Sequence, residues 1–215
     1  MNELGRAIIT GTTAFTASNI DDFVVLMFFF AQVNATFKIR HIIIGQYLGF
    51  TTLLIASLPG FFGSFIIPEY WLGLLGFVPI IIGISRLINL QKAQEEVQAV
   101  ADVNIARRSI LARLLNPQIF NVAAITIANG GDNIGIYLPL FASSDLTSLI
   151  VIVIVFFVLI LVWCYIAYLL TRHHSIARVL TRYGHAIVPF ILIGLGIYIL
   201  IDNDTLQLLH KFQSN

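Results

Sequence analysis

Cysteine and charge are both scarce in this sequence of 215 residues. Its single cysteine, Cys164, excludes an internal disulfide framework. Lys and Arg number 12 against 11 Asp and Glu, and a formal net charge of +1 excludes a strongly basic nucleic-acid-binding protein. Charged residues make up only 11% of the chain, hydrophobic residues make up 58%, and the mean hydropathy is +0.91. This composition excludes an ordinary soluble domain and predicts an integral membrane protein surrounded by lipid.

Six apolar stretches are long enough to cross a bilayer, since a helix needs about 20 mostly apolar residues to span roughly 30 Å of hydrocarbon. Asp21 and Asp22 interrupt the first stretch and no small-residue cleavage site follows, so we do not expect a removable signal peptide. The sequence therefore predicts an all-α membrane protein with six transmembrane helices. We place them at residues 7–32, 41–63, 70–90, 117–142, 147–170 and 185–202.

The basic residues predict the orientation of these helices. Ten of the twelve fall in loops that share one side of the membrane, and only Arg6 and Lys211 lie on the other. The positive-inside rule places the basic loops in the cytoplasm and both termini outside, in a multi-pass protein of the cell (inner) membrane. The longest of these loops, residues 91–116, combines helix-forming residues with mixed charge and predicts a cytoplasmic linker that contains an amphipathic helix.

One polar pattern occurs twice, at an offset of 111 residues. When NGGDNIGIY at 129–137 is laid on SNIDDFVVL at 18–26, the polar residues of both copies fall at i, i+3 and i+4, on one face of a helix. Pro79 in LLGFVPIIIGI and Pro189 in HAIVPFILIGLGI repeat in the same way. Because three helices are an odd number, the second copy enters the membrane from the opposite side, as an inverted 3+3 repeat. The predicted repeats are residues 1–90 and 117–215, the second with a short tail.

The repeat places Asp21, Asp22 and Asp132 near the centre of the bilayer. An ionised Asp at a lipid-exposed helix centre costs roughly 2.5–3.5 kcal/mol on insertion scales, so these side chains need a partner or a wet cavity. The nearest basic residue, Arg86, is expected to extend from the cytoplasmic end of its helix to the membrane interface. Two interpretations stay open. The carboxylates stabilise a broken helix or reach Arg86, or they form a cation site, which we favour.

Oxygen ligands of this kind suit divalent cations such as Mg²⁺, Ca²⁺ or Mn²⁺. The adjacent glycines, Gly130 and Gly131, either loosen the helix and expose carbonyl groups or permit close helix packing. Gln46 and Thr51 either line the cavity or belong to hydrogen bonding between helices. The predicted cation ligands are Ser18, Asn19, Asp21, Asp22, Asn129, Asp132 and Asn133.

Four stretches of the sequence carry a resemblance to a known family. TASNIDDFVVLMFFF at 16–30, IGQYLG at 44–49, LGLLGFVPIIIGI at 72–84 and NGGDNIGIYLPLF at 129–141 resemble the cadmium resistance transporter family, within the lysine-exporter superfamily. The resemblance covers nearly the whole chain apart from the central loop and the tail. It implies a six-helix exporter of bacterial type that removes Cd²⁺ or related divalent cations from the cytoplasm, with both acidic motifs in the ion path.

The sequence thus predicts a transporter of divalent cations (Cd²⁺, Mn²⁺, Mg²⁺, Ca²⁺ or Zn²⁺), not an enzyme, with no cofactor. Cys164 is expected to be a small buried residue rather than a thiolate ligand, so cadmium is not singled out as the native cargo. A bound cation would expel a proton from Asp21 or Asp22, which predicts exchange for protons. Export of a basic amino acid is an alternative that needs an intramembrane Arg for the carboxylate, and an intramembrane aspartyl protease is another.

Overall fold

The computed structural model describes residues 3–66, 69–88, 116–171 and 174–202. In these ranges all regular structure is helical, as predicted. The predicted amphipathic helix at 91–116 lies outside the described residues, except for Asn116. The elements are α1 (Glu3–Ser18), α2 (Ile20–Ala31), α3 (Ile39–Gly63), α4 (Glu69–Leu72), the 3₁₀ helix η1 (Gly73–Gly76), α5 (Phe77–Ile88), α8 (Pro117–Asn129), α9 (Gly131–Ala142), α10 (Leu146–Leu170) and α11 (His174–Asp202).

Two of the six predicted spans are single helices with nearly the predicted bounds. α3 and α10 have 25 residues each, which corresponds to a length of about 37 Å. Among the described residues, these two helices are long and apolar enough to cross a membrane, and the bent pair of α1 and α2 makes a third if it counts as one span. Leu74–Ile88 and Val188–Asp202 are shorter apolar helices. The six-span prediction is therefore confirmed only in its helical content.

The first and fourth predicted spans are each broken, at positions 111 residues apart. α1 and α2 meet at Asn19 with a bend of 60°, and α8 and α9 meet at Gly130. The backbone angles are alike, with φ −104° and ψ 16° at Asn19 and φ −85° and ψ 15° at Gly130. The expectation that each polar triplet shares one face of a continuous helix is wrong, because Ser18 and Asn129 lie before the break in each copy.

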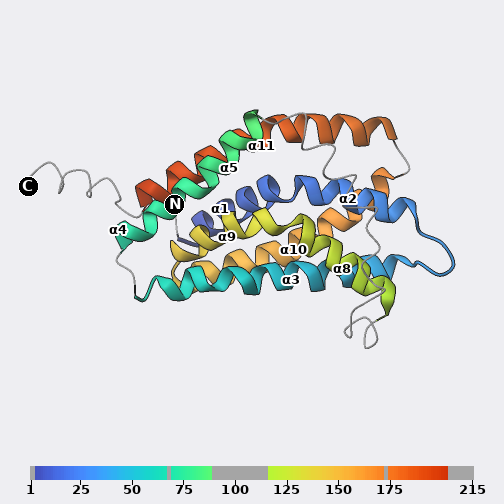
Figure 1. The fold of residues 1–215 in the computed structure, drawn as a ribbon, viewed down its shortest axis with the longest axis horizontal. Coiled ribbons are helices and arrows are strands. Elements are labelled where there is room, and N and C mark those ends of the chain that lie inside the picture. The colour runs from blue at the N-terminus through green and yellow to red at the C-terminus, as the bar shows by residue number, and fades with distance from the viewer. Residues whose placement is uncertain (1–2, 67–68, 89–115, 172–173, 203–215) are drawn as a thin grey trace, which may run out of the picture.

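The third and sixth predicted spans also differ from expectation. The segment predicted at 70–90 consists of α4, η1 and α5, and α11 begins at His174 instead of residue 185. α5 and α11 lie side by side along one side of the bundle (Figure 1). They run antiparallel and touch through glycine, since a Cβ atom added at Gly83 would lie 2.7 Å from the carbonyl oxygen of Pro189 and one at Gly76 would lie 2.6 Å from that of Gly196.

The long helices run alternately between the two ends of the bundle (Figure 1). α8 and α9 pack along α3, and α1 and α2 pack along α10. Phe15, Phe50, Tyr137 and Phe156 meet where these four segments cross, with ring centroids 4.9 Å apart for Tyr137 and Phe156 and 5.7 Å apart for Phe15 and Phe50. These rings form the centre of a core that positions both helix breaks.

The outer surface of the helices is strongly apolar. Ile55 on α3, Ile81 on α5 and Phe190 on α11 are 61%, 63% and 64% exposed. Side chains of this kind lie along all the long helices, far beyond the scattered apolar residues of a soluble surface, and lipid is the medium that covers them without cost. This surface agrees with a membrane protein. Cys164 is 2% exposed, which confirms that it is a buried residue.

Candidate functional site

The break between α1 and α2 is held by side chains from three helices. The Asn19 side chain donates to the carbonyl oxygen of Phe15 at 2.9 Å and to the Tyr137 hydroxyl at 2.6 Å, and Trp163 donates from Nε1 to the carbonyl oxygen of Asn19 at 3.0 Å. Asn competes in this way for the carbonyl groups of its own helix, which favours a bend. Ser18 Oγ lies 2.7 Å from the Tyr137 hydroxyl. Two predicted ligands, Ser18 and Asn19, thus belong to this network.

Next to this network, Asp22 is buried and held by amide groups. Its side chain is 3% exposed, accepts a hydrogen bond from Asn129 Nδ2 at 2.6 Å, and lies 3.4 Å from Asn133 Nδ2. The described residues place no Lys or Arg against it. Asn133 is 1% exposed, and its Oδ1 atom is buried without a hydrogen-bond partner. A buried carboxylate beside an unsatisfied amide oxygen is the arrangement that a cation would complete.

Asp21 and Asp132 meet a different partner, the guanidinium group of Arg86. Arg86 Nη2 lies 2.8 Å from Asp21 Oδ2 and also donates to Asp132 Oδ2. The side chains of Arg86, Asp21 and Asp132 are 17%, 15% and 40% exposed. The expectation that Arg86 extends to the membrane interface is therefore wrong. α5 packs against α9, and the arginine gains two carboxylates there instead of water.

The predicted ligands consequently fall into three adjoining groups. Ser18 and Asn19 hold the first break, Asn129 and Asn133 hold Asp22, and Arg86 joins Asp21 to Asp132. Within the described ranges, no three His, Cys, Asp or Glu side chains lie as they would around a metal ion. Even so, the charges of Asp132 and Asp21 act on Asp22 by Coulomb repulsion. Three carboxylates and one guanidinium leave two formal negative charges in this region.

The remaining site residues explain how the helices approach each other. Thr126 donates to Gln46 Oε1 at 2.7 Å, so Gln46 takes part in hydrogen bonding between α3 and α8. Thr51 is half-buried. Gly130 is buried against Leu53, whereas a Cβ atom added at Gly131 would have no neighbour within 4 Å. Close packing therefore accounts for Gly130 and not for Gly131.

Sequence reasoning missed Tyr137 and misjudged Arg86. One signal for Tyr137 was present, because the internal alignment pairs this hydroxyl-bearing residue with Leu26. For Arg86 the signal was weaker. It follows the apolar stretch IIIGIS at the end of its helix, where an arginine is ordinarily at the interface. Only the packing of α5 against α9 brings it to the carboxylates.

Comparison with known proteins identifies the family of the chain. The family model described as Cadmium resistance transporter matches residues 15–212. The chain belongs to the cadmium resistance transporter family. The matched residues include both helix breaks and Arg86, and the family is one of transporters rather than enzymes. No curated protein and no solved structure is significantly similar to the chain.

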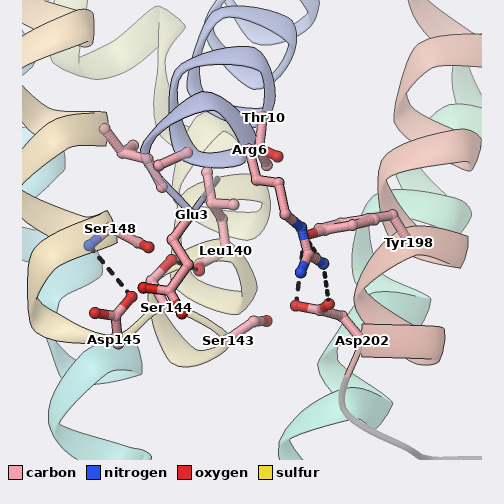
Figure 2. A pocket seen from close by; sticks show the side chains of 12 residues that line it. Glu3, Arg6, Thr10, Leu140, Ser143, Ser144, Asp145, Ser148, Tyr198 and Asp202 are labelled. Carbon is pink, nitrogen blue, oxygen red and sulfur yellow. Dashed lines mark hydrogen bonds and ion pairs between the residues drawn. The ribbon is translucent and has the colours of Figure 1, made fainter. Parts of the chain in front are cut away.

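This member of the cadmium resistance transporter family has a separate polar pocket where α1 begins (Figure 2). Its volume is about 250 Å³, and Glu3, Asp145 and Asp202 bring carboxylates to its wall. Arg6 pairs with Asp202 at 2.7 Å and ties α1 to the end of α11. Hydrogen bonds from Ser148 hold the pKa of Asp145 below its ordinary value. Arg6 lies roughly 20 Å along α1 from the break, so this pocket is distinct from the carboxylate site.

Proposed function

We propose that the protein exports divalent metal cations across the cell (inner) membrane in exchange for protons. The observation that carries this proposal is the environment of Asp22, whose carboxylate is 3% exposed and is held by the amides of Asn129 and Asn133. A buried carboxylate without a cationic neighbour is unfavourable, and binding a proton or a metal cation removes the cost. The two states of Asp22 then alternate during transport. Family membership supports Cd²⁺ as one cargo.

The charge of the site supports a divalent cargo. Asp21, Asp22, Asp132 and Arg86 together leave two formal negative charges, which one divalent cation or two protons balance. Carboxylate and amide oxygens are the ligands that hard divalent cations prefer. We therefore propose an exchange of one divalent cation for two protons, with Asp22 as a ligand of the cation and as one proton carrier. The second proton binds at Asp21 or Asp132.

The arrangement of the helices supports the predicted architecture. We propose six spans in an inverted repeat, residues 1–90 and 117–215, with both termini outside. The breaks at Asn19 and Gly130 occupy matching places, and each broken pair packs along the long helix of the other half. In folds of this kind, rocking of one repeat against the other exposes a central site to either side of the membrane in turn.

Export of a basic amino acid remains a second candidate, because Arg86 supplies the intramembrane guanidinium that a substrate carboxylate would need. Transport in inverted vesicles that contain the full-length protein tests both candidates. Uptake of Cd²⁺ and Mn²⁺ and the internal pH are recorded, with lysine or arginine added as competitor. We expect metal uptake with loss of internal protons and no effect of the amino acids. Uptake of labelled lysine without metal uptake would favour the second candidate.

Asp22→Asn is the decisive variant in this assay, because it removes the charge and keeps the shape. We expect at least a hundredfold loss of metal uptake. Asp202→Asn, which removes a carboxylate at the end of the bundle, is the matched control and should keep most of the activity. Uptake by Asp22→Asn at the rate of the control would contradict the proposed site, and metal uptake that is indifferent to a pH gradient would contradict proton exchange.

The orientation is tested separately with single cysteines and an impermeant thiol reagent. Cysteines placed near Glu69 or Asp145 should react from outside the cell, and cysteines near Lys92 or Arg178 should not. The opposite pattern would reverse the proposed topology without affecting the proposed cargo.

A further inference from the structure

Arg86 holds the place of a cation at the carboxylate site. Its guanidinium lies 2.8 Å from Asp21 on α2 and donates to Asp132 on α9. We propose that Arg86 is a built-in substitute for the transported cation, which must release Asp21 and Asp132 before the metal ion can bind them. This inference rests on the proposed function and adds to it a competition between one arginine and the cargo.

The contacts of Arg86 are those of a counter-ion. Its side chain is 17% exposed and its partners are the two carboxylates, one from each half of the protein. An arginine that is only a scaffold would normally bind helix ends or backbone carbonyls. Here it neutralises charges that would otherwise repel each other across the two halves. A divalent cation needs the same carboxylate oxygens, so the two cannot occupy them together.

Arg86 also breaks the internal symmetry of the protein. The offset of 110 residues that pairs Pro79 with Pro189 pairs Arg86 with Gly196. Asp21 and Asp132, in contrast, occupy matching positions of the two copies. The carboxylates thus belong to the repeated framework, whereas the arginine is an addition to one half. One such cation is enough to occupy both carboxylates in the empty protein.

This competition gives a result that a structural role would not. If Arg86 competes with the metal, removal of its charge leaves the carboxylates free, and the metal should bind more tightly and leave more slowly. Loss of a unit charge a few ångströms from the ion corresponds to roughly a tenfold or larger gain in affinity. If Arg86 instead only holds the helices in place, its removal should distort the site and weaken binding.

Isothermal titration of the purified full-length protein with Cd²⁺ tests the proposal. We expect Arg86→Gln to bind Cd²⁺ at least tenfold more tightly than the wild type and to transport it more slowly. Arg86→Lys keeps the charge and should stay within about threefold of the wild-type affinity. Arg6→Gln is the matched control, because Arg6 pairs with Asp202 at the end of the bundle, and its affinity should be unchanged. Equal or weaker binding by Arg86→Gln would overturn the proposal.

A measurement on the wild type avoids any folding defect of the variants. Phenylglyoxal modifies accessible guanidinium groups, and the adducts are counted by mass spectrometry. Cd²⁺ should speed modification of Arg86 and leave Arg6 unaffected, because the metal displaces only the former from its carboxylates. Slower or unchanged modification of Arg86 would overturn the competition. If wild-type protein neither bound nor transported metal, the proposed function itself would fail, which is a separate outcome.

Discussion

The two helix breaks have nearly the same backbone conformation and reach it by opposite means. At the first break the Asn19 side chain bonds to Phe15 and Tyr137, and Trp163 bonds to its carbonyl group. At the second break Gly130 has no side chain, and Gly131 faces open space. A polar network that is fully bonded specifies one geometry, whereas glycine permits several. The first break is therefore the fixed one, and the second is the adaptable one.

This difference assigns separate roles to the two copies of the polar motif. The first copy contributes Ser18 and Asn19 to a buried network that includes Tyr137 of the second copy. The second copy contributes Asn129 and Asn133 to Asp22 of the first. Each half thus completes the other. A relative movement of the halves, as transport requires, changes the surroundings of Asp22 and leaves the bonds of Asn19 to its own helix intact.

Asn19→Gly gives the first break the chemistry of the second and should have the largest effect. The variant loses the bonds to Phe15 and Tyr137 and gains backbone freedom, so we expect a loss of about 3 kcal/mol in the free energy of unfolding. Thermal unfolding of the purified protein, followed by tryptophan fluorescence, measures it. Gln32→Ala, a change at an exposed side chain near the end of α2, should stay within about 0.5 kcal/mol of the wild type. Equal melting of the two variants would contradict a fixed first break.

Gly130→Ala tests the second break with an intermediate effect. An added Cβ atom would overlap the Leu53 side chain and lie 3.2 Å from Asn133 Nδ2, so we expect a loss of about 2 kcal/mol. Gly131→Ala is the matched control, because its added Cβ would meet no atom within 4 Å. It should be neutral or stabilising by up to about 1 kcal/mol through helix propensity. The reverse order of the two melting temperatures would show that the breaks pack differently.

Tyr137→Phe separates the fixed network from the cation site. Loss of the hydroxyl group removes the partner of Ser18 and Asn19 and should cost about 1.5 kcal/mol of stability. Because the hydroxyl does not contact Asp22, metal uptake per folded molecule should stay within about twofold of the wild type. A loss of uptake as large as that of Asp22→Asn would place Tyr137 in the ion path instead.

The smallest effect concerns the helix starts that lie outside the breaks. Asp145 caps α10 by accepting from the backbone of Thr147 and Ser148, whereas Lys38 at the start of α3 makes no such side-chain bond. Asp145→Ala should therefore cost about 1 kcal/mol or less at pH 7. Since folding lowers the pKa of Asp145, its contribution is present above the unfolded pKa of about 4 and is lost as the pH falls through the lowered folded value. Melting of both proteins at pH 7 and pH 3 should show the difference vanish in acid.

Hydropathy and local signals were enough to locate the helices. Unbroken apolar stretches predict α3 and α10 to within two residues of their observed bounds, and Pro117 after Asn116 marks the start of α8. The repeated acidic motif was also readable, because its spacing depends only on the order of residues in the chain. These features are local, and neighbouring residues decide them.

The tertiary structure decided how the acidic motif is used. The bend at Asn19 depends on Tyr137 and Trp163, which lie 118 and 144 residues away. Arg86 reaches Asp132 because α5 packs against α9, and hydropathy contains no information about which way a side chain at a helix end points. The division of the carboxylates between Arg86 and the amides of Asn129 and Asn133 follows from helix rotation and contact, which exist only in the packed bundle.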